Sequence, residues 1–282
     1  MKKKIPAVLL CAALLFCAVS VSAFAAAQPV YLVLGDSIAF GSGLSNPREA
    51  VYGRIVADTN GYEYFNYAVP GHTTGNLLRR MAEETVKDAI KKADIINISI
   101  GGNNFLLGNL NDLMYDGIVK ADYSRFDSIA EGFYADLGTI VDTIRALNGG
   151  AALILQTIYN PQTGYVGEVY RNGADRINAM LRAYDAAHPG EIIIADVAAA
   201  LTDSDRDFAE DRIHPSAAGN EKIARVILAT LRENGLGSGT EPVIAAAGKD
   251  ARGAGVFTLF VNFYGRFFHV LSVIRNLFTR IR

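Results

Sequence analysis

A serine, a histidine and an aspartate in this 282-residue chain have the surroundings that nucleophilic catalysis requires. Ser37 follows a short apolar run and Asp36, and Asp211 stands three residues before His214. A serine hydroxyl is a weak nucleophile until a base accepts its proton, and histidine serves as that base when an acceptor fixes its tautomer. Asp211 can reach Nδ1 of His214 within a single turn, which leaves Nε2 to face Ser37. We therefore expect Ser37 as nucleophile, His214 as base and Asp211 as the acid that orients the base.

Three neutral hydrogen-bond donors could stabilise the oxyanion that forms when such a serine attacks a carbonyl carbon. They are the backbone N–H groups of Ser37 and Gly71 and the side-chain amide of Asn103. Removing one donor of this kind typically costs about 2.7–4 kcal/mol of transition-state stabilisation. Glycine suits position 71, because a residue without Cβ lets the backbone approach a substrate closely. The sequence therefore predicts an oxyanion hole formed by these three residues.

Each candidate also has a purely structural interpretation. Ser37 could be the N-cap of a helix and Asn103 a turn residue, and Asp36 is expected to brace the turn. Other histidines compete for the role of base, but only His214 has both a carboxylate three residues upstream and a helix directly after it. The competing histidines are His72, His188 and His269, and the nearby acids, which we expect in a solvated loop, are Asp203, Asp205 and Asp207.

Short apolar runs alternate with helical patterns between residues 28 and 236. The runs at 30–34, 63–67, 95–100, 152–157 and 191–195 are mostly continuous, as in strands buried on both faces. Helical patterns occupy 75–92, 126–147, 168–187 and 216–233. This order predicts an α/β fold with a parallel sheet and helices on both faces. Ligands bind at the carboxyl ends of such strands, and the candidate residues follow strands or precede a helix.

Four blocks of this sequence, at 35–41, 69–74, 101–104 and 211–215, resemble in content and order those of the SGNH (GDSL-type) hydrolases, a family of serine esterases and lipases. The resemblance covers about residues 30–232. It implies a three-layer α/β/α flavodoxin-like fold with a five-stranded parallel sheet, and a site without metal or cofactor. It also implies the same roles for Ser37, Gly71, Asn103, Asp211 and His214. The third block departs from the frequent Gly-x-Asn-Asp pattern, because Asn104 replaces the last carboxylate, which puts the support of that loop in doubt.

Charge and composition exclude several other classes. Net charge is −2 for the chain and −9 for residues 28–236, which argues against nucleic acid as a partner. No phosphate-binding or dinucleotide-binding glycine motif is present, and the four histidines show no metal-ligand spacing. Residues 1–27 have the basic start, apolar run and small residues of a secretory signal peptide, so we expect a secreted protein. Both cysteines, Cys11 and Cys17, lie in that segment, which excludes thiol catalysis after its removal.

The C-terminal part differs from the body at 28–236. Residues 237–256 are rich in glycine and alanine and predict a flexible linker. Residues 257–282 place polar and basic side chains on one helical arc and aromatic and aliphatic side chains on the other. Such a basic amphipathic helix is typical of binding at an anionic membrane surface. The alternative is that it packs on the protein itself or on a second copy.

Two segments are expected to form walls of the site. Residues 105–123 have many apolar side chains, and residues 159–170 have three tyrosines. Apolar residues beside a reactive serine suit an acyl chain, although they could equally be core residues. We therefore expect an ester-linked lipid or lysophospholipid as substrate. The first alternative is an esterase that removes O-acetyl groups from a polysaccharide. The second is a secreted binding module on an inactive scaffold, which the intact set of candidate residues disfavours.

Overall fold

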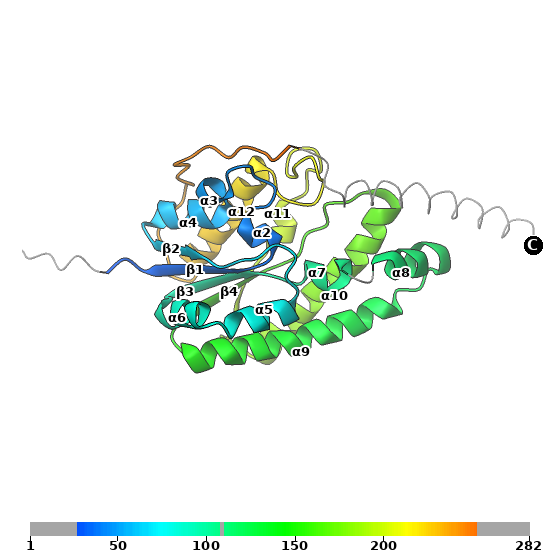
Figure 1. The fold of residues 1–282 in the computed structure, drawn as a ribbon, viewed down its shortest axis with the longest axis horizontal. Coiled ribbons are helices and arrows are strands. Elements are labelled where there is room, and N and C mark those ends of the chain that lie inside the picture. The colour runs from blue at the N-terminus through cyan, green and yellow to red at the C-terminus, as the bar shows by residue number, and fades with distance from the viewer. Residues whose placement is uncertain (1–26, 108–109, 253–282) are drawn as a thin grey trace, which may run out of the picture.

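The computed structural model describes residues 27–107 and 110–252. Its centre is a five-stranded parallel sheet in the order β2-β1-β3-β4-β5 (Figure 1). The strands are β1 (Val30–Gly35), β2 (Glu63–Asn66), β3 (Ile95–Ser99), β4 (Ala152–Gln156) and β5 (Ile193–Ala195). This is the strand order of flavodoxin-like folds, in which the winding direction reverses between the first and third strands. The predicted three-layer fold is confirmed.

The alternation of side chains along each strand divides the interior into two cores. In β1, Leu32 and Leu34 face one core, whereas Tyr31 and Val33 face the other. The first core is covered by α5 (Thr74–Met81), α6 (Glu84–Lys92), α7 (Gly102–Leu106), α8 (Leu110–Met114), the π-helix η1 (Tyr115–Lys120), α9 (Ser124–Leu147) and α10 (Gly164–Ala187). The second is covered by α2 (Ser37–Phe40), α3 (Pro47–Ala50), α4 (Tyr52–Asn60), α11 (Val197–Ala200) and α12 (Ala217–Glu233). Figure 1 shows α4 and α12 on one side of the sheet and α5, α6 and α9 on the other.

The expected strands agree with the observed ones to within two residues at each end. The expected helix at 75–92 is instead two helices, α5 and α6, separated at residues 82 and 83. The crossover helix α4 was not predicted, although its residues Tyr52, Ile55 and Val56 are buried against the sheet. None of the helices in the described ranges is both long and apolar enough to cross a bilayer.

The described part of the expected linker, residues 237–252, runs along the body without helix or strand. Asn60 Oδ1 accepts hydrogen bonds from the backbone N–H groups of Ser238 and Gly239, and Arg225 on α12 forms an ion pair with Glu241 at 2.7 Å. These contacts attach the segment to the layer of α4 and α12, which its composition alone did not indicate. Residues 1–26 of the expected signal peptide and the expected amphipathic helix at 257–282 lie outside the described residues.

Candidate active site

Ser37 lies at the point where β1 passes into α2, at the carboxyl edge of the sheet. Asp36, not Ser37, is the N-cap of this helix: its Oδ1 accepts a hydrogen bond from Ile38 N at 3.0 Å. The Asp36 N–H donates to the carbonyl of Ser99 at the end of β3, also at 3.0 Å. The hydroxyl of Ser37 is therefore not used for capping.

The close approach of β1 to β3 before this turn requires glycine at position 35. Gly35 has φ +131°, and a Cβ there would lie 2.0 Å from the carbonyl oxygen of Ser99. We expect Gly35→Ala to lower the free energy of unfolding by about 3 kcal/mol or more, because backbone strain adds to a clash with backbone. Gly61→Ala is the matched control, since Gly61 has φ +69° but open space around it, and it should cost about 1–2 kcal/mol. Equal losses in urea unfolding would contradict the clash.

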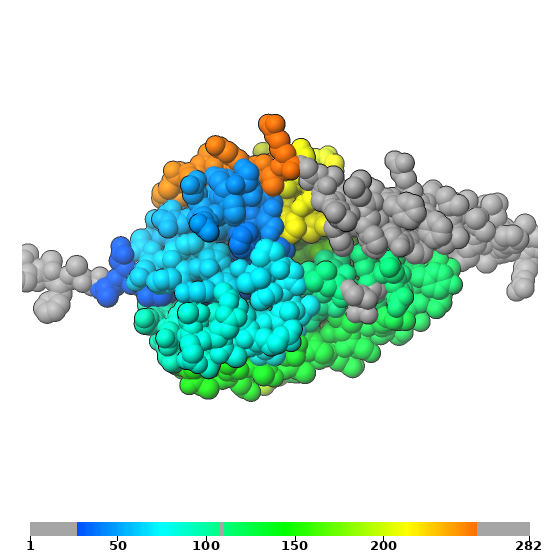
Figure 2. Space-filling view, in the orientation of Figure 1, coloured from blue at the N-terminus to red at the C-terminus, as the bar shows by residue number. Residues whose placement is uncertain are grey.

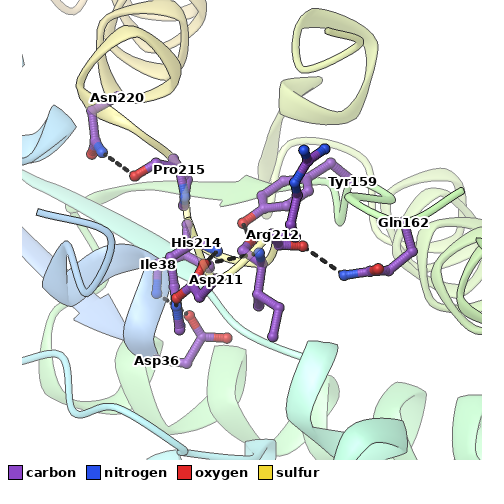
Figure 3. Close-up of polar contacts among 10 residues, drawn as sticks. Asp36, Ile38, Tyr159, Gln162, Asp211, Arg212, His214, Pro215 and Asn220 are labelled. Atoms are coloured by element: carbon purple, nitrogen blue, oxygen red, sulfur yellow. Dashed lines mark hydrogen bonds and ion pairs between the residues drawn. The ribbon is translucent and has the colours of Figure 1, made fainter. Parts of the chain in front are cut away.

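Asp211 and His214 meet in the turn before α12, as expected from their spacing (Figure 3). His214 Nδ1 lies 2.5 Å from Asp211 Oδ2, while Asp211 Oδ1 accepts hydrogen bonds from the N–H groups of Ile213 and His214, each at 3.0 Å. Partial burial alone would raise the pKa of Asp211, but the hydrogen bond from His214 and its nearby charge outweigh burial and lower it. Asp211 is therefore held as an anion that can fix the imidazole.

Three side chains outside the predicted set hold this turn in place (Figure 3). Tyr159 donates to the carbonyl of Ile213 at 2.8 Å, and Gln162 donates to the carbonyl of Arg212 at 2.6 Å. Asn220 on α12 donates to the carbonyl of Pro215 at 3.1 Å. Tyr159 and Gln162 belong to the segment expected to wall the site. No local pattern shows that they bind a turn some 50 residues away.

Two of the three predicted oxyanion donors, Gly71 and Asn103, follow β2 and β3. Gly71 is exposed and has φ +81°, a conformation that glycine adopts without strain. Asn103, near the start of α7, donates one side-chain N–H to the carbonyl of His72 at 2.9 Å, and this bond fixes the orientation of its amide. The second N–H of the amide is the one left to serve as the predicted oxyanion donor. Asn104 supplies the support that its difference from the family pattern put in doubt. Its Oδ1 accepts from Thr74 N at 3.1 Å, and its Nδ2 donates to Thr74 Oγ1 at 2.7 Å.

A cavity of about 240 Å³ joins these segments, and its wall includes Ser37, Gly71, Asn103 and His214. Asp211, which is hydrogen-bonded to His214, does not itself line the cavity. The remaining lining residues are Asp36, Ile38, Ser42, Pro70, Gly102, Leu106, Leu107, Tyr170 and Ile213. Of the expected walls, only part lines the cavity: Leu106, Leu107 and Tyr170 do, whereas Phe105 and Leu113 are buried in the core.

The competing residues lie in other surroundings. His188 stacks on Tyr184, with ring centroids 4.2 Å apart, and His72 contributes its carbonyl, but not its ring, to the contact with Asn103. His269 lies outside the described residues. Asp207, expected in a solvated loop, is instead fully buried and paired with Lys222 at 2.7 Å. Within the described ranges, no three histidine, cysteine or acidic side chains gather into a group that could hold a metal ion.

Asp36 lines both the large cavity and a smaller one of about 30 Å³, whose wall also includes Gln156 and Thr157. Burial raises the pKa of Asp36 to about 7, against smaller opposing effects of the Ile38 hydrogen bond and His214. The folded protein then binds this proton more tightly than the unfolded chain. The free energy of unfolding of the protein therefore falls as the pH rises from 3.8, the ordinary pKa of an aspartate, to about 7, the raised pKa of Asp36.

We expect Asp36→Asn, which keeps the capping oxygen but cannot ionise, to remove this loss. The free energy of unfolding of the variant, taken relative to that of the parent protein, should be higher by on the order of 2–4 kcal/mol at about pH 8 than at about pH 5. Urea unfolding at both pH values measures this difference. Asp175→Asn, at an exposed position on α10, is the control and should show none. An equal effect of Asp36→Asn at both pH values would mean that Asp36 is ionised throughout.

Comparisons with known proteins agree with this architecture. The model of the GDSL-like Lipase/Acylhydrolase family matches residues 33–222. An uncharacterized protein of Bacillus subtilis (strain 168), YpmR, is 26% identical over 223 residues, which are 73% of this chain and 83% of that protein. The lipase Lip_vut3 from a goat rumen metagenome has a similar structure, with a TM-score of 0.59, 23% identity, and coverage of 74% of this chain and 99% of that one. Phospholipase A1 from Streptomyces albidoflavus NA297 has a TM-score of 0.55, 18% identity, and coverage of 73% and 99%. Since the family match covers more than half of the chain and includes all four sequence blocks around the cavity, the chain belongs to the GDSL-like lipase/acylhydrolase family.

Proposed function

We propose that this protein hydrolyses carboxylic esters of lipids or lysophospholipids, with Ser37, His214 and Asp211 as its catalytic residues. The observation that carries the proposal is that Ser37 and His214 line one cavity, while His214 is hydrogen-bonded to Asp211. Membership of an acylhydrolase family supports hydrolytic chemistry in general. The apolar side chains of Ile38, Leu106 and Leu107 on the cavity wall support an acyl substrate.

The reaction would proceed in two steps. His214 takes the proton of Ser37 as the Ser37 oxygen attacks the ester carbonyl. The N–H groups of Ser37, Gly71 and Asn103 donate hydrogen bonds to the carbonyl oxygen as it gains negative charge. The imidazolium, stabilised by Asp211, then protonates the departing alcohol, and an acyl-enzyme remains. In the second step His214 activates a water that attacks the acyl-enzyme, and the acid leaves as Ser37 regains its proton.

The place of action is part of the same proposal. The sequence of residues 1–27 supports export, and the basic amphipathic pattern of residues 257–282 supports association with an anionic membrane surface. An enzyme whose substrate lies in a bilayer benefits from such a segment, because the segment raises the effective concentration of the enzyme at the membrane surface.

An acyl-chain series of p-nitrophenyl esters, measured beside acetylated xylan, tests the substrate class. We expect turnover of the esters, with chains longer than acetyl preferred, and no release of acetate from xylan. A preference for acetyl groups on xylan would favour the polysaccharide esterase instead. Protein that neither cleaves any ester nor reacts with a fluorophosphonate probe would support the binding-module alternative.

A further inference from the structure

Residues 247–251, which we call the hook, lie across residues 41–46, the loop that follows α2. In Figure 2 the orange residues of this segment lie against the blue residues that follow β1. Hydrogen bonds join hook and loop: Ser45 N donates to the carbonyl of Lys249 at 2.8 Å, Ala251 N to the carbonyl of Gly43 at 2.9 Å, and Lys249 N to Oδ1 of Asn46 at 2.9 Å. The family match ends at residue 222, so the hook lies outside the part of the chain that it covers.

The loop beneath the hook is bound in turn to the residue that carries the candidate nucleophile. The carbonyl of Ser37 accepts hydrogen bonds from the N–H groups of Gly41 and Ser42, both at 3.0 Å. Ser42 also lines the catalytic cavity. A displacement of this loop would therefore move the backbone of Ser37 together with part of the cavity wall.

The hook also binds the start of the helix that follows His214. Asp250 Oδ1 accepts a hydrogen bond at 2.6 Å from the N–H of Ala217, the first residue of α12. Gly248 packs on the same residue, since a Cβ at Gly248 would lie 2.7 Å from Cβ of Ala217. Beneath the hook, loop and turn are in direct contact, because a Cβ on Gly43 would lie 3.1 Å from Cβ of His214.

We propose that the hook is a positioning element of the active site, which through Asp250 keeps the loop bound to Ser37 and the turn of His214 at their working separation. Proton transfer between these two side chains requires hydrogen-bond distance, and a misplacement of about 1 Å can cost on the order of 100-fold in rate. Asp250 does not line the cavity, so it acts through His214 and Ser37 and not on the substrate. The inference rests on the proposed ester hydrolysis for its kinetic readout.

The kinetic test uses full-length variants and a soluble p-nitrophenyl ester, at a temperature where circular dichroism shows each variant to be folded. Asp250→Ala removes the acceptor of the Ala217 N–H, whereas Asp250→Asn keeps an oxygen in its place. We expect Asp250→Ala to lower kcat by about tenfold and to change KM by less than about twofold. Asp250→Asn should stay within about twofold of the parent in both constants.

A second variant and a matched control separate positioning from general attachment of the segment. Gly248→Val should lower kcat to a similar extent as Asp250→Ala, because the added side chain would displace the hook from Ala217. Glu241→Ala is the control, since Glu241 attaches the same segment to α12 by its ion pair with Arg225 at 2.7 Å, further along the helix from His214. It should leave kcat unchanged.

Amide hydrogen exchange, followed by NMR, tests the positioning without turnover. The N–H groups of Ile213 and His214 bind the carboxylate of Asp211 and not the hook, so their exchange reports on the turn itself. Their exchange should be at least about threefold faster in Asp250→Ala than in the parent, and unchanged in Asp250→Asn.

Three results would overturn the inference. If Asp250→Asn loses as much activity as Asp250→Ala, the charge of Asp250 and not its hydrogen bond explains the loss. An equal fall in kcat for Glu241→Ala, or unchanged exchange at residues 213 and 214 in Asp250→Ala, would also exclude a positioning role. If the parent cleaves no ester, the proposed hydrolysis fails, and the exchange rates alone decide whether the hook positions the turn.

Discussion

Replacing Ser37 with alanine is expected to lower kcat/KM for a soluble p-nitrophenyl ester by about 10⁵–10⁶-fold, the loss seen when a serine hydrolase loses its nucleophile. The reason is that alanine has no hydroxyl to attack the ester carbonyl. The fold should be unaffected, since Asp36 rather than Ser37 caps α2. Initial rates under matched conditions and labelling by a fluorophosphonate probe measure the two consequences, and labelling should disappear with activity.

Ser42→Ala is the matched control, because Ser42 is a second serine on the wall of the same cavity. It should retain most of the activity and all of the labelling. A Ser37→Ala protein with more than about a hundredth of the parent activity would exceed what the oxyanion hole and binding alone supply. The nucleophile would then have to be another group.

Asp211→Asn is expected to lower kcat by about 10⁴-fold, with a smaller effect on KM. The asparagine can still accept hydrogen bonds through Oδ1 from the N–H groups of Ile213 and His214, so the turn should keep its shape. The contact with His214 Nδ1 changes, because a neutral amide stabilises the imidazolium poorly and can favour the wrong tautomer. Steady-state kinetics measures the loss, and circular dichroism and thermal unfolding check the fold.

Asp205→Asn separates this role from that of a nearby acid. Asp205 belongs to the same loop but is exposed and pairs with Arg212 at 3.1 Å, not with His214. It should change kcat less than about threefold, since exposed ion pairs contribute little. Comparable losses in the two variants would indicate a general effect of charge in this loop rather than an acid that orients the base.

The sequence was sufficient for the sheet and for the order of the segments around the site. Apolar runs such as Ile95–Ser99 predict buried strands because a parallel sheet is covered on both faces. Once the strands are parallel, their carboxyl ends meet at one edge, so Ser37 and Asn103 were expected at the same edge of the sheet. The pairing of β1 with β3 then makes the two segments neighbours. The contact of Asp211 with His214 was predictable for a different reason: it is local and needs only one turn.

Contacts between distant segments could not be predicted from local patterns. The crossover helix α4 has a weaker pattern than the strands, and its burial depends on packing against β1 and α12. Asp207 stands in a segment whose composition is typical of a solvated loop, yet it is buried and forms an ion pair with Lys222 on α12. Tyr159 and Gln162 carry no sign in their own segment that they hold the His214 turn.

The sequence by itself therefore determined the fold class and the chemical identity of the candidate groups, because strand burial, turn residues and functional side chains are local properties. The tertiary structure alone decided that Asp36 rather than Ser37 caps α2, which apolar side chains line the cavity, and that residues 249–251 bind the loop after α2. These depend on hydrogen bonds and packing between residues as far apart as Gly43 and Ala251, whose free energy appears only when the whole domain is assembled.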